Sequence, residues 1–139
     1  MSQDNEQYAY FTITGAFDPA EITRWVGLEP TESWRKGDTQ PKTLRERKFG
    51  RWSLRSRLAD SADLEDHIRD VLAQMDQRPE AFQSVAREFR GWMQLVGYFH
   101  LQYPGLHFEP SLVAGLARYG LGVDFDFYEL YSDAREDTG

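Results

Sequence analysis

Residues 8–27 read YAYFTITGAFDPAEITRWVG, and they hold the plainest signals of local structure in the chain. In the first seven, apolar residues alternate with polar ones, which predicts a strand with one buried face. Asp18 and Pro19 then suit the N-cap and the first position of a helix, and Gly27 suits its end. The chain therefore opens with a strand followed by a helix.

Working outward, the same alternation predicts three more strands, over 51–58, 92–103 and 123–131. Helical periodicity predicts a helical hairpin over 61–90 and a third amphipathic helix over 109–119. This order contains two strand–helix–strand units, which is typical of a ferredoxin-like duplication. We therefore predict an α+β, ferredoxin-like two-layer sandwich. Its four-stranded sheet has the order 4-1-3-2 and helices on one face, and the helical hairpin is inserted between the two units.

The composition fits one globular domain. The 139 residues are 40% hydrophobic, which is enough to build a core. We expect a single domain over residues 1–139, with 1–7 and 132–139 frayed. The apolar faces of the predicted elements give the expected core: Phe11, Ile13, Ile22, Trp25, Trp52, Leu54, Ile68, Phe99, Leu116, Phe125 and Phe127.

The sequence lacks residues that several classes of function require. The chain has no cysteine, which excludes disulfides, thiolate metal sites and cysteine nucleophiles. Its histidines are not spaced as metal ligands, so we expect neither a metal nor a cofactor. No apolar run is long enough to span a bilayer and the N-terminus lacks secretory features, so we expect a cytoplasmic protein without membrane contact.

An acid–base site is the one catalytic arrangement that the residues allow. Asp124 and Asp126 share a strand face, and His100 lies on another strand. Alternation alone explains both aspartates, and no nucleophile–base–orienter set is visible. We therefore lean against an enzyme.

Charge is unevenly distributed along the chain. Residues 35–57 hold nine of the 16 basic residues and two acidic ones, so this segment is +7 and the rest is −14. We favour neutralisation within the domain, because opposite charges attract. A binding site for an anion or an acidic partner is the alternative. The net charge of −7 disfavours general binding of nucleic acid.

The most unusual segment is the irregular basic loop over 28–50, which contains Trp34, Arg35, Lys36 and Asp38. One interpretation is an anion or peptide pocket with Trp34 as its wall and Arg35 as a fork. The other is a loop that Trp34 anchors in the core. We expect Trp34 to pack against Trp52, with Arg35 and Lys36 facing an acidic group.

The outward face of the sheet is the second candidate site. Alternation predicts that it collects tyrosines, arginines and acids, which suits an interface with a protein partner or a second copy of the chain. An ordinary solvated face is equally consistent with this composition. The residues expected there are Tyr8, Tyr10, Thr12, Arg51, Arg55, Tyr98, His100, Asp124, Asp126 and Tyr128.

Several short runs carry a resemblance to a known family. They are residues 10–15, Asp18-Pro19 with Ile22, LEPT at 28–31, SWRKGD at 33–38 and GRWSL at 50–54. The chain resembles the bacterial domain of unknown function 4279 (DUF4279), most specifically over 8–55 and weakly over 108–128. That family has no assigned activity, although small bacterial domains of this general kind accompany toxins as immunity proteins.

Two hypotheses follow for the function. The first is a non-catalytic protein-interaction module, of which an immunity-type inhibitor is one form. The alternative is a small-ligand or anion-binding sensor that uses the loop of Trp34, Arg35 and Lys36.

Overall fold

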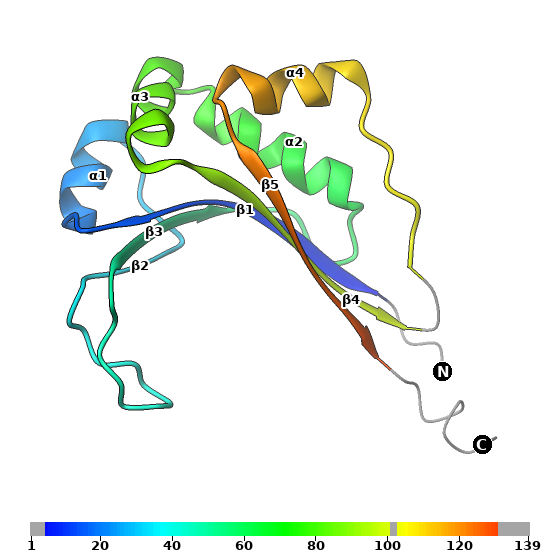
Figure 1. The fold of residues 1–139 in the computed structure, drawn as a ribbon. Helices are drawn as coiled ribbons and strands as arrows, with labels where there is room; N and C mark the ends of the chain where they lie inside the picture. The colour runs from blue at the N-terminus through cyan, green and yellow to red at the C-terminus, as the bar shows by residue number, and fades with distance from the viewer. Residues whose placement is uncertain (1–4, 101–102, 131–139) are drawn as a thin grey trace.

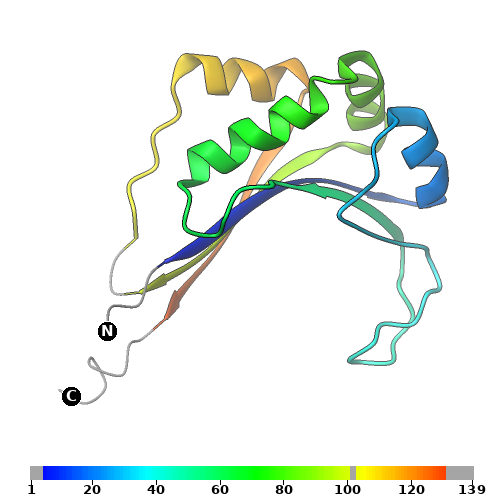
Figure 2. The ribbon, with the colours of Figure 1, turned by 180° about the vertical axis from the view of Figure 1, so that it is seen from behind.

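The computed structural model describes residues 5–100 and 103–130, which form two layers (Figure 1). All helices lie on one face of an arched mixed sheet, as the view from behind also shows (Figure 2). The strands are β1 (Glu6–Gly15), β2 (Glu32–Trp34), β3 (Gly50–Arg55), β4 (Trp92–His100) and β5 (Gly122–Leu130). The helices are α1 (Pro19–Val26), α2 (Leu64–Met75), α3 (Pro79–Phe89) and α4 (Pro110–Arg118).

Helix α1 begins and ends where the sequence predicts. The side chain of Asp18 accepts a hydrogen bond from the Ala20 N–H at 3.0 Å, and Pro19 is the first helical residue. Gly27 has a φ of 73° and donates its N–H to the Thr23 carbonyl at 2.8 Å. Only glycine adopts this left-handed geometry without strain, so Gly27 ends the helix.

The order of the strands differs from the prediction. Over the described residues the sheet has five strands in the order β2-β3-β1-β4-β5, with β1 antiparallel to both neighbours and β4 parallel to β5. The predicted four-stranded, ferredoxin-like sheet of order 4-1-3-2 is wrong, because β2, inside the segment expected to be a loop, adds a reversal of the chain. As a result β3 returns directly beside β1. The α+β class and the coverage of one face by helices are as predicted.

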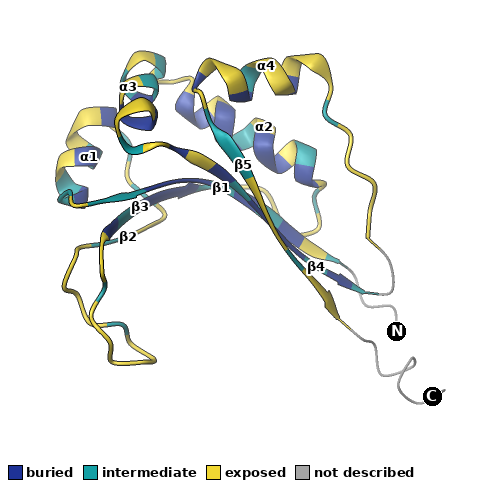
Figure 3. Ribbon diagram, in the orientation of Figure 1, coloured by how far each residue is buried: buried dark blue, intermediate teal, exposed yellow. Residues whose placement is uncertain are grey.

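The core lies between the sheet and the helices (Figure 3). Eight of the eleven predicted core residues are buried. The helical hairpin adds the buried face of α2 and α3, which packs against the same cluster. The eight are Phe11, Ile13, Ile22, Trp52, Leu54, Ile68, Phe99 and Leu116.

Three predicted core residues are not fully buried. Trp25 is 42% exposed, because the short helix α1 buries only the narrow stripe of Pro19, Ile22 and Val26. Phe125 is 51% exposed and Phe127 is partly buried. Both lie on β5, which is an edge strand and has a neighbouring strand on one side only.

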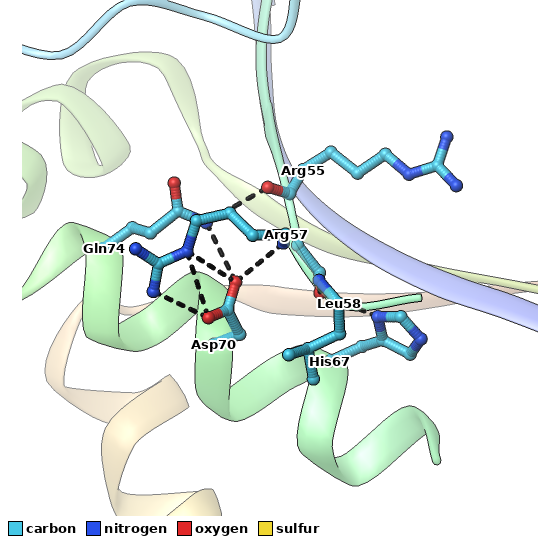
Figure 4. Close-up of polar contacts among 7 residues, drawn as sticks. Arg55, Arg57, Leu58, His67, Asp70 and Gln74 are labelled. Atoms are coloured by element: carbon cyan, nitrogen blue, oxygen red, sulfur yellow. Dashed lines mark hydrogen bonds and ion pairs between the residues drawn. The ribbon is translucent and has the colours of Figure 1, made fainter. Parts of the chain in front are cut away.

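A cluster of polar contacts fixes α2 to the end of β3 (Figure 4). The Arg57 guanidinium donates to Asp70 Oδ1 at 2.7 Å, and its backbone N–H donates to Asp70 Oδ2 at 2.8 Å. Gln74 Nε2 donates to Asp70 Oδ2 and to the Arg55 carbonyl, each at 3.1 Å. These contacts bind the chain that leaves the sheet to the first helix of the hairpin.

The first strand starts earlier than predicted. Gln7 is buried, its N–H donates to the Asp60 carbonyl, and its side chain donates to the Ala62 carbonyl, both at 2.9 Å. Residues 6 and 7 are therefore ordered rather than frayed. The predicted fraying of 132–139 and the strand residues 101, 102 and 131 lie outside the described residues. In the described ranges, every helix is too short or too polar to cross a bilayer.

Candidate functional site

The sheet face away from the helices carries the predicted alternating side chains, and we call it the open face. The register places Tyr10 beside Arg55 on β3 and beside Gln94 on β4. Gln94 in turn lies beside Asp124 on β5. Because side chains alternate between faces along each strand, this one row shows which residues of β3, β1, β4 and β5 lie on the same face. The ten predicted residues, from Tyr8 to Tyr128, therefore share the open face.

Trp34 belongs to the open face, and the prediction that it packs against Trp52 is wrong. In the β2–β3 pair, Trp34 lies opposite Arg51, whereas Trp52 lies opposite Ser33. Trp34 and Trp52 therefore point to opposite faces of the sheet. Trp52 is fully buried in the core, where its indole N–H donates to Thr23 Oγ1 at 3.0 Å. The two predicted sites, the loop and the sheet face, meet at Trp34.

Two arginines cover the Trp34 ring. The guanidinium carbon of Arg47 lies 3.6 Å from the ring centroid, and that of Arg51 lies 5.2 Å away. The indole N–H donates to the Phe49 carbonyl at 3.2 Å. Cation–π contacts and this hydrogen bond hold the ring in one orientation at the rim of the sheet.

A second arginine–aromatic group lies on β1 and β3. The Arg55 guanidinium carbon lies 3.7 Å from the Tyr8 ring centroid, and Tyr8 stacks with Tyr10 at 6.1 Å. Burial raises the pKa of both tyrosines, and the nearby arginines, Arg55 for Tyr8 and Arg51 for Tyr10, oppose this rise. Both phenols therefore remain neutral near pH 7 and can donate hydrogen bonds.

Tyr8, Tyr10, Thr31, Glu32, Ser53 and Arg55 line a hollow of about 210 Å³ on the same face. One wall is aromatic, and Glu32 and Arg55 supply groups of opposite charge. A hollow of this size can receive one side chain of a partner.

The β5 side of the open face is acidic and aromatic. Tyr98 and Tyr128 stack with ring centroids 5.1 Å apart and planes 12° from parallel. A hydrogen bond with Asp126 raises the pKa of the Tyr128 hydroxyl. Asp124 and Asp126 are both exposed. The open face thus has arginines toward β3 and carboxylates toward β5, with tyrosines between them.

The three residues that an acid–base site would need do not converge. His100 lies opposite Leu130, whereas Asp126 lies opposite Val96. Four residues of β4 separate these positions, or about 13 Å along the strand. The His100 backbone N–H donates to Asn5 Oδ1 at 2.8 Å, so this end of β4 is tied to the start of the chain. The geometry does not favour acid–base catalysis by these groups.

The loop between β2 and β3 is a hairpin that projects beyond the open face (Figures 1 and 2). The Gly37 and Arg47 N–H groups donate across it to the Arg47 and Asp38 carbonyls, at 2.8 and 2.7 Å. The Asp38 carboxylate accepts the Arg35 N–H at 2.9 Å, which closes the turn. The segment predicted to be irregular therefore has a regular framework.

Arg35 meets an acidic group as predicted. Its Nε lies 3.3 Å from Asp18 Oδ1, the oxygen that caps α1. Arg55 pairs with Asp60 at 2.8 Å and Arg57 with Asp70 at 2.7 Å, so part of the basic segment is neutralised by its own chain. Lys36 is exposed. The favoured interpretation of the charge asymmetry therefore holds for three arginines.

Sequence reasoning missed several members of the open face, among them Glu32, Trp34 and Trp92. Glu32 and Trp34 were missed because β2 has only three residues and no periodicity. Trp92, which is 47% exposed, was available from alternation along β4, because it has the same parity as Tyr98.

One of three comparisons with known proteins supports the sequence resemblance. No curated protein and no solved structure matches the chain. The family model of the domain of unknown function DUF4279 matches residues 5–130, which span all the described strands and helices. The chain therefore belongs to the DUF4279 family.

Proposed function

We propose that this domain is a non-catalytic protein-interaction module that binds a folded protein partner on its open face. One observation carries the proposal. Arginine guanidinium groups lie over Trp34 and Tyr8, and the Tyr98–Tyr128 stack continues the aromatic surface across the sheet. Aromatic residues and arginine are the side chains most enriched in the energetic centres of protein interfaces.

The fixed geometry of these side chains strengthens the argument. Ring stacking and cation–π contacts hold Trp34, Tyr8 and Tyr98 in place before any partner binds. A surface that is ordered in advance loses less side-chain entropy on association. The hollow beside Tyr10 provides a receptacle for one anchoring side chain.

The charge distribution describes the partner. Arg47 and Arg51 carry positive charge at the β3 side, and Asp124 and Asp126 carry negative charge on β5. A partner of the opposite arrangement, acidic opposite β3 and basic opposite β5, would be complementary. An immunity-type inhibitor is one form that such a module takes, and its partner would then be a toxin.

The anion-sensor alternative has weaker support. A groove of about 610 Å³ lies between the start of α1 and the loop, and it is lined by Trp34 and Arg35. Its lining also contains Asp18, Glu29 and Asp38 against only two arginines, and Arg35 already pairs with Asp18. An anion entering the groove would meet more negative than positive side chains.

The experiment compares variants of the two faces. The wild type, Tyr10→Ala/Arg51→Ala and the helix-side control Val113→Lys are immobilised and exposed to host extract, and retained proteins are quantified. Val113 is 51% exposed on α4, so its replacement leaves the open face unchanged. We expect one protein to be retained by the wild type and the control and lost by the double variant. When the retained partner is purified and added to the domain, it should slow amide hydrogen exchange in β1 and β3.

Three outcomes contradict the proposal. Equal retention by all three proteins places the interface elsewhere. Retention of single-stranded nucleic acid in place of a protein assigns the aromatic face to base stacking. The third outcome is self-association: in light scattering the mass of the wild type rises with concentration, whereas Tyr98→Glu remains a monomer. The open face would then bind a second copy of the chain.

A further inference from the structure

The outer edge of β5 is unlike the other edge of the sheet. The β2 edge has three residues, whereas the β5 edge has nine. Within the part of the chain that the structure describes, β5 pairs with β4 alone. A long edge strand offers a row of backbone hydrogen-bonding groups to any added strand, so soluble proteins usually keep such edges short or covered. The length of this edge therefore needs an explanation.

The hydrogen bonds show which backbone groups point outward. The Phe125 N–H donates to Asp124 Oδ1, a side-chain atom of its own strand, at 3.1 Å. The Asp124 carbonyl instead accepts from Gln94 Nε2 of β4 at 3.4 Å. Backbone groups of successive residues alternate between the two sides of a strand. The outward groups therefore belong to Phe125 and its odd-numbered neighbours.

Side chains along this edge alternate between acidic and aromatic. Asp124 and Asp126 are exposed on the open face. Phe125, on the other face, is 51% exposed, and Phe127 beside it packs on Phe99 with ring centroids 5.0 Å apart. The edge thus presents a row of carboxylates on one face and a row of aromatic rings on the other.

We propose that the outer edge of β5 binds an extended segment of another protein as an added strand, in which basic and apolar side chains alternate. The basic side chains lie beside Asp124 and Asp126, and the apolar ones lie beside Phe125 and Phe127. A carbonyl of the added strand replaces Asp124 Oδ1 on the Phe125 N–H. The carboxylate of Asp124 is then released to pair with a basic side chain. This mode is β-strand addition, in which backbone bonds give affinity and side chains give specificity.

Charge argues against a second copy at this edge. Strand β5 carries Asp124, Asp126 and Glu129 and has no basic residue. Two β5 edges paired with each other would bring the two acidic sets together, and like charges across strands are destabilising. A basic segment removes that repulsion.

The first test uses two fluorescein-labelled peptides of the same composition. In one, lysine and valine alternate over seven residues; in the other, the lysines and valines are in separate blocks. Binding to the full chain is measured by fluorescence anisotropy. We expect the alternating peptide to bind about tenfold more tightly, because only it matches both rows of side chains. Equal affinity for the two peptides overturns the proposal, since it would show only attraction between net charges.

A matched pair of variants tests the backbone bond. Phe125→Thr and Phe125→Pro both remove the ring, and only proline also removes the outward N–H. Proline is tolerated at an edge where the N–H faces outward. We expect Phe125→Pro to bind the alternating peptide about fivefold more weakly than Phe125→Thr does. Equal affinities overturn the added-strand geometry.

Further measurements keep the test decisive. Asp124→Lys/Asp126→Lys should abolish the preference for the alternating peptide. The open-face variant Tyr10→Ala/Arg51→Ala should keep it, which separates this proposal from the proposed function. If Phe125→Pro does not fold, an alternating peptide N-methylated on its bonding edge replaces it, and undiminished binding of that peptide overturns the proposal. Detection by light scattering of a dimer that forms through β5 would also overturn the proposal.

Discussion

Neighbouring residues of β4 have opposite environments on the two faces of the sheet. Phe99 is fully buried beneath the helices and packs edge-on against Phe127 with ring centroids 5.0 Å apart. Tyr98, one residue earlier, lies on the open face and stacks on Tyr128. Both are large aromatic side chains on the same strand. The helix-covered face therefore accounts for stability, whereas no described residues form a layer over the aromatic side chains of the open face.

The largest expected effect is on the covered face. Phe99→Ala should lower the free energy of unfolding by about 3–5 kcal/mol, because it removes a fully buried ring and leaves a cavity. Urea denaturation of the wild type and the variant measures the difference. A loss below about 1 kcal/mol would show that the neighbouring side chains fill the space, contrary to the packing described.

A carboxylate that joins the helical layer to β3 should have a smaller effect. Hydrogen bonds from Arg57 and Gln74 lower the pKa of Asp70, outweighing the upward effect of its burial. Asp70→Asn should lower the free energy of unfolding by about 1 kcal/mol at pH 7. The stabilisation of the ionised form is present above the unfolded pKa of 3.8 and is lost as the pH falls through the lower folded pKa.

The matched control for Asp70 is an exposed carboxylate on the open face. Asp126→Asn should leave the free energy of unfolding nearly unchanged in the same urea experiment, because Asp126 and its hydrogen-bond partner Tyr128 are both exposed. Equal losses in the two variants would mean that the Arg57–Asp70 contact contributes nothing specific to stability.

The buried His67 should make stability depend on pH in a separate range. Its Nδ1 lies 2.7 Å from Ser56 Oγ, and burial lowers its pKa from the usual 6.5, which the charge of Asp60 only partly offsets. Below about pH 6.5 the unfolded chain binds a proton at His67 that the folded chain does not. The free energy of unfolding should therefore fall as the pH is lowered from 7.5 to 5.

Two variants isolate this contribution. His67→Gln should remove most of the decrease between pH 7.5 and 5, whereas the exposed control His107→Gln should retain it. Thermal unfolding at a series of pH values measures both. An unchanged pH profile in His67→Gln would assign the decrease to other groups.

Local patterns in the sequence predicted which face each residue occupies. The alternation in β1 and β4 placed Tyr10 and Tyr98 outward and Phe11 and Phe99 inward, and the register confirms all four. Such predictions succeed because the twofold period of a strand depends only on its own residues. The prediction of the α1 caps also succeeded, because a helix cap likewise depends only on neighbouring residues.

Strand order could not be predicted in this way. It depends on contacts between distant segments, and here it turned on β2, which has three residues and no pattern of its own. The exposure of Phe125 has another cause, because the predicted order already placed its strand at an edge of the sheet. Alternation predicts which face a side chain occupies, but not how completely the helices cover that face at an edge strand. The candidate site was therefore predicted as two separate parts, which the pairing of Trp34 with Arg51 joins.

The smallest expected effect completes the comparison on β4. Tyr98→Ala should lower the free energy of unfolding by only about 0.5 kcal/mol, because it removes one ring contact on an uncovered surface. The measurement is urea denaturation at two protein concentrations a hundredfold apart. A loss as large as that of Phe99→Ala would show that the open face is covered in the folded protein. If the wild-type midpoint also rises with concentration, the cover is a second copy, because association stabilises by mass action. If the midpoint does not change with concentration, the cover belongs to the chain itself, and the open face is then not a binding surface.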